Sequence, residues 1–214
     1  QRELAARRVQ RACDQLRQWQ LIDESFADLR MQVNLSGRDV AQAGLTGRIS
    51  QALLGAGLQA QHLTLELTEN ILMERLETAL PMLEELRGLG VRLSVDDFGT
   101  GYSSLAHLST LPIDSLKVDR SFVRNLSAGS KEAMVVRGIV QLGQSLGKDV
   151  VAEGIETASQ FDQLRGMGCR LGQGFLMARP MSAERITALL VGQQPWTGGV
   201  ALPVALNPLA TQLH

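Results

Sequence analysis

The stretch VRLSVDDFGTGYSSL, residues 91–105, decides the fold. Its first residues alternate between apolar and polar, which is the period of a β-strand with one buried face. Asp96 and Asp97 then place two like charges where the strand should end, and glycines follow them directly. Because the backbone turns at the end of a strand, two consecutive side chains there need not point to opposite faces. We therefore expect both carboxylates on one side of a tight turn.

Similar runs recur along the chain and alternate with helical patterns. Strands are predicted at residues 29–35, 62–68, 91–96, 114–119, 148–153 and 169–175. Helices are predicted at residues 2–20, 39–56, 71–88, 103–109, 131–146, 157–166 and 182–191. Four glycines stand where a left-handed residue ends a helix: Gly57, Gly90, Gly147 and Gly168. Six strand–helix units in succession predict an α/β fold with a parallel sheet.

The sheet is predicted to belong to a (β/α)8 TIM-like barrel. No GxGxxG follows the first strand, which disfavours an open dinucleotide-binding sheet. Each strand carries a polar residue near its carboxyl end, opposite the apolar face, and a (β/α)8 barrel builds its active site from such positions. Six strands do not close an eight-stranded barrel. Either the first strands are absent from this sequence, which we favour, or the sheet stays open.

Composition excludes several classes of protein. A net charge of −1 over 214 residues gives no electrostatic basis for binding nucleic acid or an acidic membrane. Arg7, Arg8 and Arg11 are interpreted as the solvated face of a helix. Cys13 and Cys169 lie far apart without a CxxC pair, so we expect free thiols. With no signal peptide and no apolar run near the roughly 20 residues that span a bilayer, a soluble cytoplasmic protein is expected.

The polar residues at the strand ends form a set with a common chemistry. They are Asn34, Glu66, Asp96, Asp97, Lys117, Glu153 and Gln173, with Glu69 and Glu156 just beyond. If they meet, several carboxylates surround one lysine, and such groups either share protons or bind cations. Oxygen ligands in this number suit Mg²⁺, Mn²⁺ or Ca²⁺. Two such ions about 3.5–4 Å apart could clamp a phosphoryl group during its displacement.

Each of these residues also has an ordinary structural interpretation. Asp96 and Asp97 could be a helix cap and a surface charge, and Glu69 could cap a helix that begins near Asn70. Lys117 alone would most often be a surface lysine, and Gln173 beside two glycines could be a turn residue. Six strands that each end in a compatible polar residue favour the functional interpretation of the set.

Six ordered motifs resemble one family. They are VNLS (33–36), ELTEN (66–70), DDFGTGYSSL (96–105), LPIDSLKVDRSFV (111–123), AEGIET (152–157) and GCRLGQGFLMARP (168–180). They resemble the motifs of the EAL-domain phosphodiesterases, which hydrolyse the bacterial second messenger cyclic di-GMP to linear pGpG. The resemblance runs from about residue 9 to 190. It implies a barrel domain over residues 1–193, incomplete at its N-terminus. The segment 194–214 has no periodicity and three prolines, which predicts a flexible tail.

The resemblance also implies roles for individual residues. Asn34, Glu66 and Asp96 match metal ligands, and Asp97 matches the ligand of a second metal. Lys117 matches the residue that orients the catalytic water, and Glu153 matches a general base or further metal ligand. Glu69 matches a residue that holds the loop after Asp97, which the family uses in metal binding and dimerisation. Gln173, Glu156 and Phe175 match positions that contact or support a guanine.

The implied cofactors are two Mg²⁺ or Mn²⁺ ions. Ca²⁺ is expected to inhibit because its coordination is larger and less ordered. The implied partners are cyclic di-GMP, a second copy in a homodimer, and N-terminal sensory or GGDEF-type domains. Nucleic acid and membrane contacts are not expected.

One motif of the family is missing. The Glu-Ala-Leu signature and the phosphate-binding arginine that follows it are not present, and Arg2-Glu3-Leu4 lies in a helical pattern. We expect that this sequence omits the start of the domain, and that a polypeptide this short would show little activity. Two alternatives stay open: a catalytically silent receptor for cyclic di-GMP, and a sugar-phosphate barrel enzyme of another family.

Overall fold

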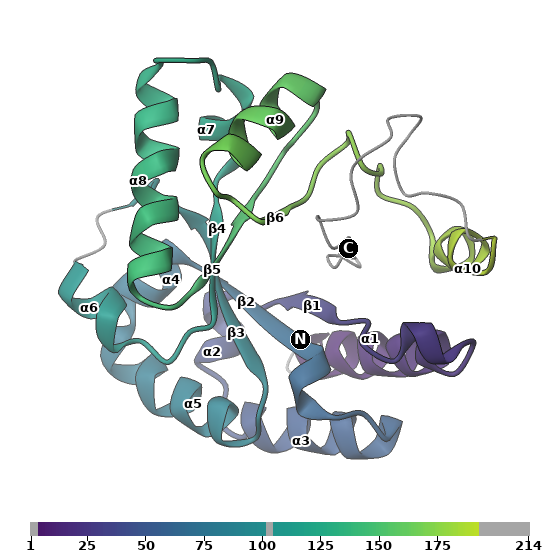
Figure 1. Cartoon of the computed structure of the whole chain (residues 1–214). Helices are drawn as coiled ribbons and strands as arrows, with labels where there is room; N and C mark the ends of the chain where they lie inside the picture. The colour runs from purple at the N-terminus through teal and green to yellow at the C-terminus, as the bar shows by residue number, and fades with distance from the viewer. Residues whose placement is uncertain (1–3, 102–104, 193–214) are drawn as a thin grey trace. The chain divides into compact units, whose positions relative to one another are not determined.

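The computed structural model describes residues 4–101 and 105–192 (Figure 1). Its six strands follow one another in the sheet in chain order. They are β1 (Met31–Asn34), β2 (Leu63–Thr68), β3 (Arg92–Phe98), β4 (Ser115–Val118), β5 (Asp149–Ala152) and β6 (Leu171–Gly172). The pairs β1–β2, β4–β5 and β5–β6 are parallel, as predicted. The predicted tail at 194–214 lies outside the described residues.

Helices connect these strands. They are α1 (Leu4–Gln20), α2 (Gly37–Val40), α3 (Leu45–Ala56), α4 (Glu69–Glu74), α5 (Leu76–Gly88), α6 (Leu105–Thr110), α7 (Arg120–Arg124), α8 (Lys131–Ser145), α9 (Ala158–Gly166) and α10 (Ala183–Val191). Two short 3₁₀ turns, η1 (Glu24–Phe26) and η2 (Ala60–His62), complete the elements. No helix in the described part of the chain has the length and apolar character needed to cross a membrane.

The chain divides into two compact units. Among the described residues, the first unit contains 4–94 and 110–113, and the second contains 95–101, 105–109 and 114–192. Strand β3 begins in the first unit and ends in the second.

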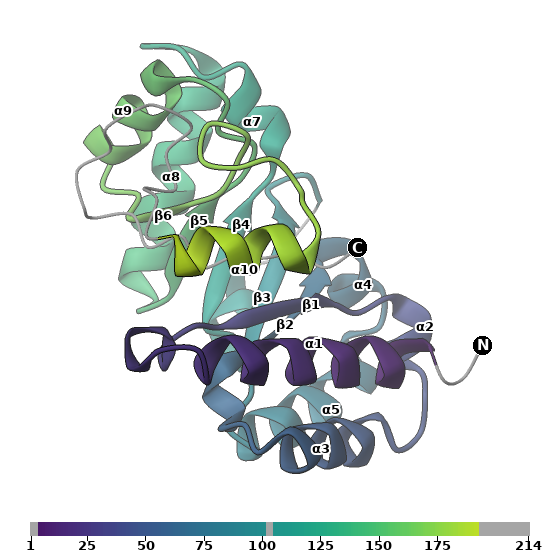
Figure 2. The same cartoon turned by 90° about the vertical axis from the view of Figure 1, so that its right-hand side faces the viewer.

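The core of the first unit forms between α1, α3 and the strands β1 and β2. Helix α1 packs against α3 and against β1, and it runs beside β1 in Figure 2. Its apolar residues recur at helical spacing, so Val9, Cys13 and Leu16 are all buried. They meet a sheet face whose apolar residues, such as Met31 and Leu63, are also buried. This confirms the amphipathic interpretation of the N-terminal segment.

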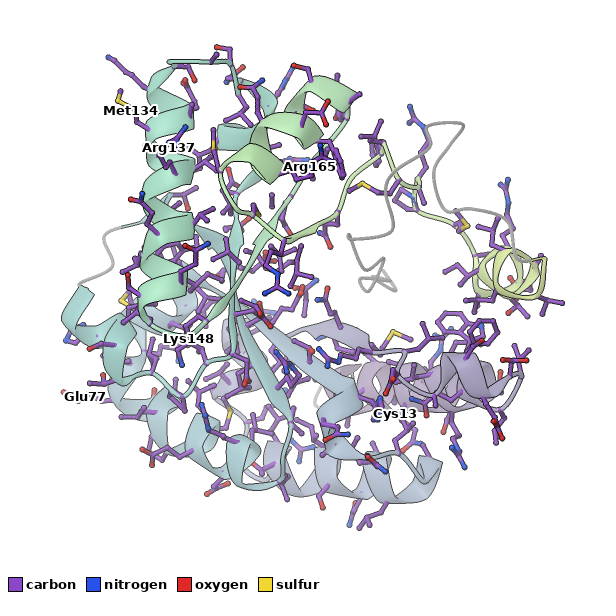
Figure 3. All side chains as sticks on the ribbon, viewed as in Figure 1. Cys13, Glu77, Met134, Arg137, Lys148 and Arg165 are labelled. Atoms are coloured by element: carbon purple, nitrogen blue, oxygen red, sulfur yellow. The ribbon has the colours of Figure 1, made fainter. Side chains whose placement is uncertain are left out.

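The core of the second unit forms where α8 packs on β4, β5 and α7 (Figure 1). Val136, Ile139 and Val140 make up the buried face of α8. Gly143 permits this approach, because a Cβ there would collide with the side chain of Val150. Met134 extends from α8 away from the strands and is 64% exposed (Figure 3).

The predicted helices differ from the observed ones in three places. The segment 39–56 is two helices, because Gly44 adopts a left-handed φ of 76° between α2 and α3. The segment 71–88 is also two helices, separated at Arg75, whose φ is −130°. Helix α7 was not predicted; it begins where Asp119 accepts a hydrogen bond from the Ser121 N–H.

The four predicted glycine caps are confirmed, with φ values between 63° and 89°. The last strand is much shorter than its predicted range of 169–175. Beyond β6 the backbone still bonds to its neighbour, because the Ile155 N–H donates to the Gln173 carbonyl and the Leu176 N–H donates to the Ile155 carbonyl. Gly174 allows this close approach, since a Cβ at that position would collide with backbone atoms of Ile155.

Candidate active site

The turn that ends β3 carries both aspartates of the opening stretch. Asp97 has a φ of 53° and is the non-glycine residue with a positive φ among the described residues. This left-handed conformation costs about 1–2 kcal/mol for most residues and is least unfavourable for Asn and Asp. The turn is fixed by hydrogen bonds from the Asp97 N–H to Asp96 Oδ1 at 3.1 Å and from Thr100 Oγ1 to the Asp97 carbonyl at 2.9 Å. The expected tight turn is therefore present.

Lys117 lies in β4 and is fully buried, with a relative exposure of 0%. Its Nζ lies 2.5 Å from Glu153 Oε1 and 3.3 Å from Asp96 Oδ1. A lysine is almost never fully buried unless it is paired. The interpretation of Lys117 as a surface lysine is therefore wrong, and its ammonium joins carboxylates from the ends of β3 and β5.

Glu153 directly follows β5 and is held from two sides. Besides Lys117, it meets Gln173, whose Nε2 donates a hydrogen bond to Glu153 Oε1 at 2.7 Å. Gln173 directly follows β6, and its N–H donates to the Ala152 carbonyl at 2.9 Å. Its other amide atom, Oε1, is buried and has no hydrogen-bond partner among the described residues. Gln173 therefore orients the Glu153 carboxylate, and it is more than a turn residue.

Asp96, Asp97 and Glu153 form an oxygen cluster. Each offers one carboxylate oxygen, and these three atoms lie within 4.8 Å of one another. Hard oxygen donors at this spacing fit Mg²⁺ or Mn²⁺. Asp96 and Asp97 lie at the end of β3 and Glu153 directly follows β5, the strand on the other side of β4. We call Asp96, Asp97 and Glu153 the acidic cluster.

Like charges repel each other within the acidic cluster. Burial raises the pKa of Asp97, and the charge of Asp96 and a hydrogen bond with Asp119 raise it further, while the Lys117 charge acts in the opposite direction. The ammonium of Lys117 pairs with two of the three carboxylates, those of Asp96 and Glu153. A divalent cation would relieve their repulsion, so the donor set and its electrostatics fit a metal.

Asp119 is a member of this site that the sequence reasoning missed. Burial opposes ionisation of its carboxyl group, but hydrogen bonds from Ser121 and the bond with Asp97 lower its pKa. The same carboxylate caps α7 through the Ser121 N–H. Its position directly after β4, at the carboxyl end of the sheet, was the available signal.

Asn34 and Glu66 form a pair in the first unit. They are opposite each other in the parallel register of β1 and β2, so their side chains point to the same side of these strands. The Leu35 N–H donates to the Glu66 carbonyl at 2.8 Å. Glu66 is fully buried, whereas Asn34 is exposed. Their role as metal ligands stays a prediction.

Glu69 is also in the first unit, where it is 1% exposed and is the first residue of α4. Thr68 occupies the cap position of that helix, so Glu69 does not cap it.

In the second unit, Glu156 is exposed and its N–H donates to Gln160 Oε1. Phe175 is 49% exposed, and the guanidinium carbon of Arg179 lies 4.8 Å from its ring centroid. This exposed aromatic ring offers a flat surface for a base.

The sequence model of the EAL domain matches residues 1–180 of this chain. The chain belongs to the EAL domain family. This membership excludes the sugar-phosphate barrel of another family. The chain superposes on a solved structure of the PaMucR phosphodiesterase in a cyclic di-GMP complex, and the six strand–helix units are thereby identified as part of a (β/α)8 barrel. That superposition has a TM-score of 0.81 at 43% identity and covers 86% of this chain and 79% of the other.

Curated relatives from Pseudomonas aeruginosa are similar over most of this EAL chain. The bifunctional diguanylate cyclase/cyclic di-GMP phosphodiesterase MucR is 46% identical over 83% of the chain, and the cyclic di-GMP phosphodiesterase NbdA is 45% identical over 85%. The chain spans 26% and 23% of their respective lengths, about a quarter in each case.

A solved structure with bound metal is also similar. It is Klebsiella pneumoniae BlrP1 in a manganese and cyclic di-GMP complex, with a TM-score of 0.76 and 30% identity. The superposition covers 83% of this EAL chain and 44% of BlrP1. A calcium and cyclic di-GMP complex of the same protein matches equally well.

Proposed function

We propose that this chain is a metal-dependent phosphodiesterase domain that hydrolyses cyclic di-GMP to linear pGpG. The observation that carries the proposal is the acidic cluster around the buried ammonium of Lys117, in a chain of the EAL family. Relatives named as cyclic di-GMP phosphodiesterases support the substrate.

Asp96, Asp97 and Glu153 would hold divalent ions, Mg²⁺ or Mn²⁺, and two ions are proposed. Asn34 and Glu66 are proposed as further ligands on the basis of the family resemblance. When bound, such ions supply Lewis-acid stabilisation of the charge that develops on phosphoryl oxygens. Ca²⁺ is proposed to inhibit, because it does not keep the near-octahedral geometry that suits Mg²⁺.

Glu153 is proposed as the general base. Its Oε1 accepts from Lys117 and from Gln173, so the carboxylate has a fixed orientation before substrate arrives. Lys117 pairs with Glu153 and carries further N–H donors that can orient a water molecule. A positioned base of this kind typically contributes a factor of about 10²–10⁴ to the rate.

Phe175 and Glu156 are proposed to contact a guanine of the substrate. The exposed ring of Phe175, with Arg179 over it, can stack on a base, and a carboxylate can accept hydrogen bonds from the N–H groups of guanine. Gln173 would support the guanine contact of Phe175, which it precedes by two residues. Glu69 is proposed to hold the loop after Asp97. We also propose that the domain forms a homodimer in the cytoplasm, and that sensory or GGDEF-type domains belong to the same polypeptide.

The test uses the complete gene product that carries this sequence. Purified protein is incubated with cyclic di-GMP and Mn²⁺, and pGpG is measured by chromatography. We expect hydrolysis that EDTA abolishes, and a Glu153→Gln variant that folds and binds substrate but hydrolyses it at least about 100-fold more slowly. Glu132→Gln in α8 makes the same charge change away from the cluster and should leave the rate unchanged. Tight binding of cyclic di-GMP without hydrolysis in either Mg²⁺ or Mn²⁺ would reject the enzyme in favour of the silent receptor.

A further inference from the structure

We propose that Arg8 of α1 is a positioning residue for Asn34, one of the proposed metal ligands. This inference rests on the proposed function. Arg8 was interpreted from the sequence as part of a solvated helix face, together with Arg7 and Arg11. Its side chain is indeed 45% exposed, but its guanidinium is tied to the end of β1.

The guanidinium of Arg8 bonds to two groups. Its Nη2 donates to Asp39 Oδ2 at 2.9 Å and to the Asn34 carbonyl at 3.3 Å. Asp39 is 5% exposed, so this carboxylate needs partners inside the protein. Arg8 therefore connects helix α1 both to the backbone of Asn34 and to a buried charge.

Asp39 connects the Arg8 guanidinium to the start of α2. Its Oδ2 also accepts from the Ser36 N–H at 2.8 Å and from Ser36 Oγ at 2.7 Å. The Asp39 N–H returns a bond to Ser36 Oγ, which completes a capping box. Burial opposes the ionised form, but the bonds from Ser36 and Arg8 lower the pKa of Asp39, so it is charged at neutral pH. One carboxylate oxygen thus accepts three bonds from two elements.

The peptide after Asn34 is held from the opposite direction. The Leu35 N–H donates to the Glu66 carbonyl in β2, while Arg8 bonds the Asn34 carbonyl. The two groups of this one peptide unit are therefore both fixed. Because Asn34 and Glu66 are register partners, this fixes the spacing of two proposed ligand side chains.

A positioning role for Arg8 can be distinguished from a purely structural role by comparing the change in metal affinity with the change in stability when Arg8 is replaced. The Arg8 side of the ion pair is half-exposed and therefore screened by solvent, and Asp39 keeps both of its Ser36 bonds when Arg8 is replaced, so the loss of stability should be modest. Residues that orient metal ligands typically affect metal affinity by about 10–100-fold when they are replaced. Loss of Arg8 should therefore change metal binding much more than it changes the thermal midpoint.

The experiment measures Mn²⁺ affinity of the complete gene product without substrate, from the electron paramagnetic resonance signal of free Mn²⁺. Arg8→Met keeps most of the aliphatic stem and removes both bonds. We expect it to bind one Mn²⁺ about tenfold more weakly, with kcat at saturating Mn²⁺ changed less than about threefold. Arg11→Met removes the same charge from the same helix one turn away, and should bind Mn²⁺ like the wild type.

Each outcome decides the inference. Mn²⁺ affinity of Arg8→Met within about twofold of the wild type, measured well below its thermal midpoint, would overturn the role of Arg8 alone. If Arg8→Met does not fold, Arg8→Gln, which stays polar but ends two atoms short of the guanidinium Nη2 that bonds Asp39 and the Asn34 carbonyl, is judged by the same criterion. If the wild type binds no Mn²⁺ and hydrolyses no cyclic di-GMP, the proposed function fails, and the inference fails with it.

Discussion

At the scale of the residue, two side chains in the second unit depart from local rules. Asp97 adopts a left-handed backbone that few residues tolerate, and Lys117 buries its charge completely. Both departures serve the acidic cluster. The turn at Asp97 brings its carboxylate close to that of Asp96, and the ammonium of Lys117 pairs with Asp96 and Glu153. Residues that violate local preferences in this way are expected at functional sites.

The burial of Lys117 makes a stability prediction. Lys117→Met removes the cation that faces Asp96 and Glu153, and we expect the free energy of unfolding in EDTA to fall by about 3 kcal/mol. Added Mn²⁺ should raise the stability of this variant more than that of the wild type, because the ion replaces the missing charge. Urea denaturation followed by circular dichroism measures both.

Lys131→Met, at the exposed start of α8, is the matched control for that measurement. It should lower stability by less than about 0.5 kcal/mol. If Lys117→Met were as stable as the wild type in EDTA, the carboxylates would not depend on the buried ammonium.

At the scale of the element, the site depends on how closely β5 and β6 approach beyond their last paired residues. The backbone of Gln173–Leu176 bonds to that of Ile155, and this places the Gln173 amide against Glu153. The approach requires that residue 174 has no side chain. A glycine that the sequence alone would assign to a turn therefore sets the distance between two site residues.

We predict the effect of Gly174→Ala from this contact. A methyl group would collide with the Ile155 backbone, which cannot move away without breaking its bonds, so we expect a loss of roughly 1–3 kcal/mol of stability. The Gln173–Glu153 bond should lengthen, so hydrolysis of cyclic di-GMP should fall as well.

Gly166→Ala, at the end of α9, tests the specificity of that prediction. A Cβ there meets no atom within 4 Å, so the change should be neutral or slightly stabilising. Equal effects of the two substitutions on thermal midpoint and rate would contradict the importance of the close approach.

The elements show what the sequence could and could not predict. Periodicity and glycine caps located all six strands, because the apolar alternation of a strand and the left-handed residue after a helix are local properties. The breaks at Gly44 and Arg75 and the short helix α7 were missed, because apolar spacing continues across them. Periodicity also does not predict contacts between residues that are distant in sequence. Such contacts are the ion pairs of Lys117, the bond between Asp97 and Asp119, and the bond from Arg8 to the Asn34 carbonyl.

At the scale of the whole molecule, each of the two units contains one buried cysteine. Cys13 lies on α1 in the first unit (Figure 3), and Cys169 precedes β6 in the second. Burial raises the pKa of Cys13 from about 9 to about 12, with a smaller contribution from the charge of Asp14. Burial also raises the pKa of Cys169, to about 11. The two thiols therefore report separately on the two units.

These pKa values predict how stability depends on pH. The neutral thiols stabilise the folded state fully below the pKa of an unfolded thiol, near 9. This contribution is lost as the pH rises towards 11 for Cys169 and towards 12 for Cys13. Each thiol should reduce the free energy of unfolding by about 1 kcal/mol between pH 8 and pH 10. Urea denaturation across this range, compared with Cys13→Ala and Cys169→Ala, isolates the two contributions. A variant whose pH slope equals that of the wild type would show that the thiol concerned ionises equally in both states.

The most direct measurement of the central claim is crystallographic. Crystals of the complete gene product grown with Mn²⁺ are measured at the manganese absorption edge, where anomalous scattering locates the ions without assumptions about ligands. We predict anomalous peaks bound by carboxylate oxygens of Asp96, Asp97 and Glu153, at roughly the 2.0–2.2 Å expected for such ions. Well-ordered crystals with these carboxylates in place, Lys117 paired to them and no anomalous peak among them would contradict the claim that the acidic cluster is a metal site.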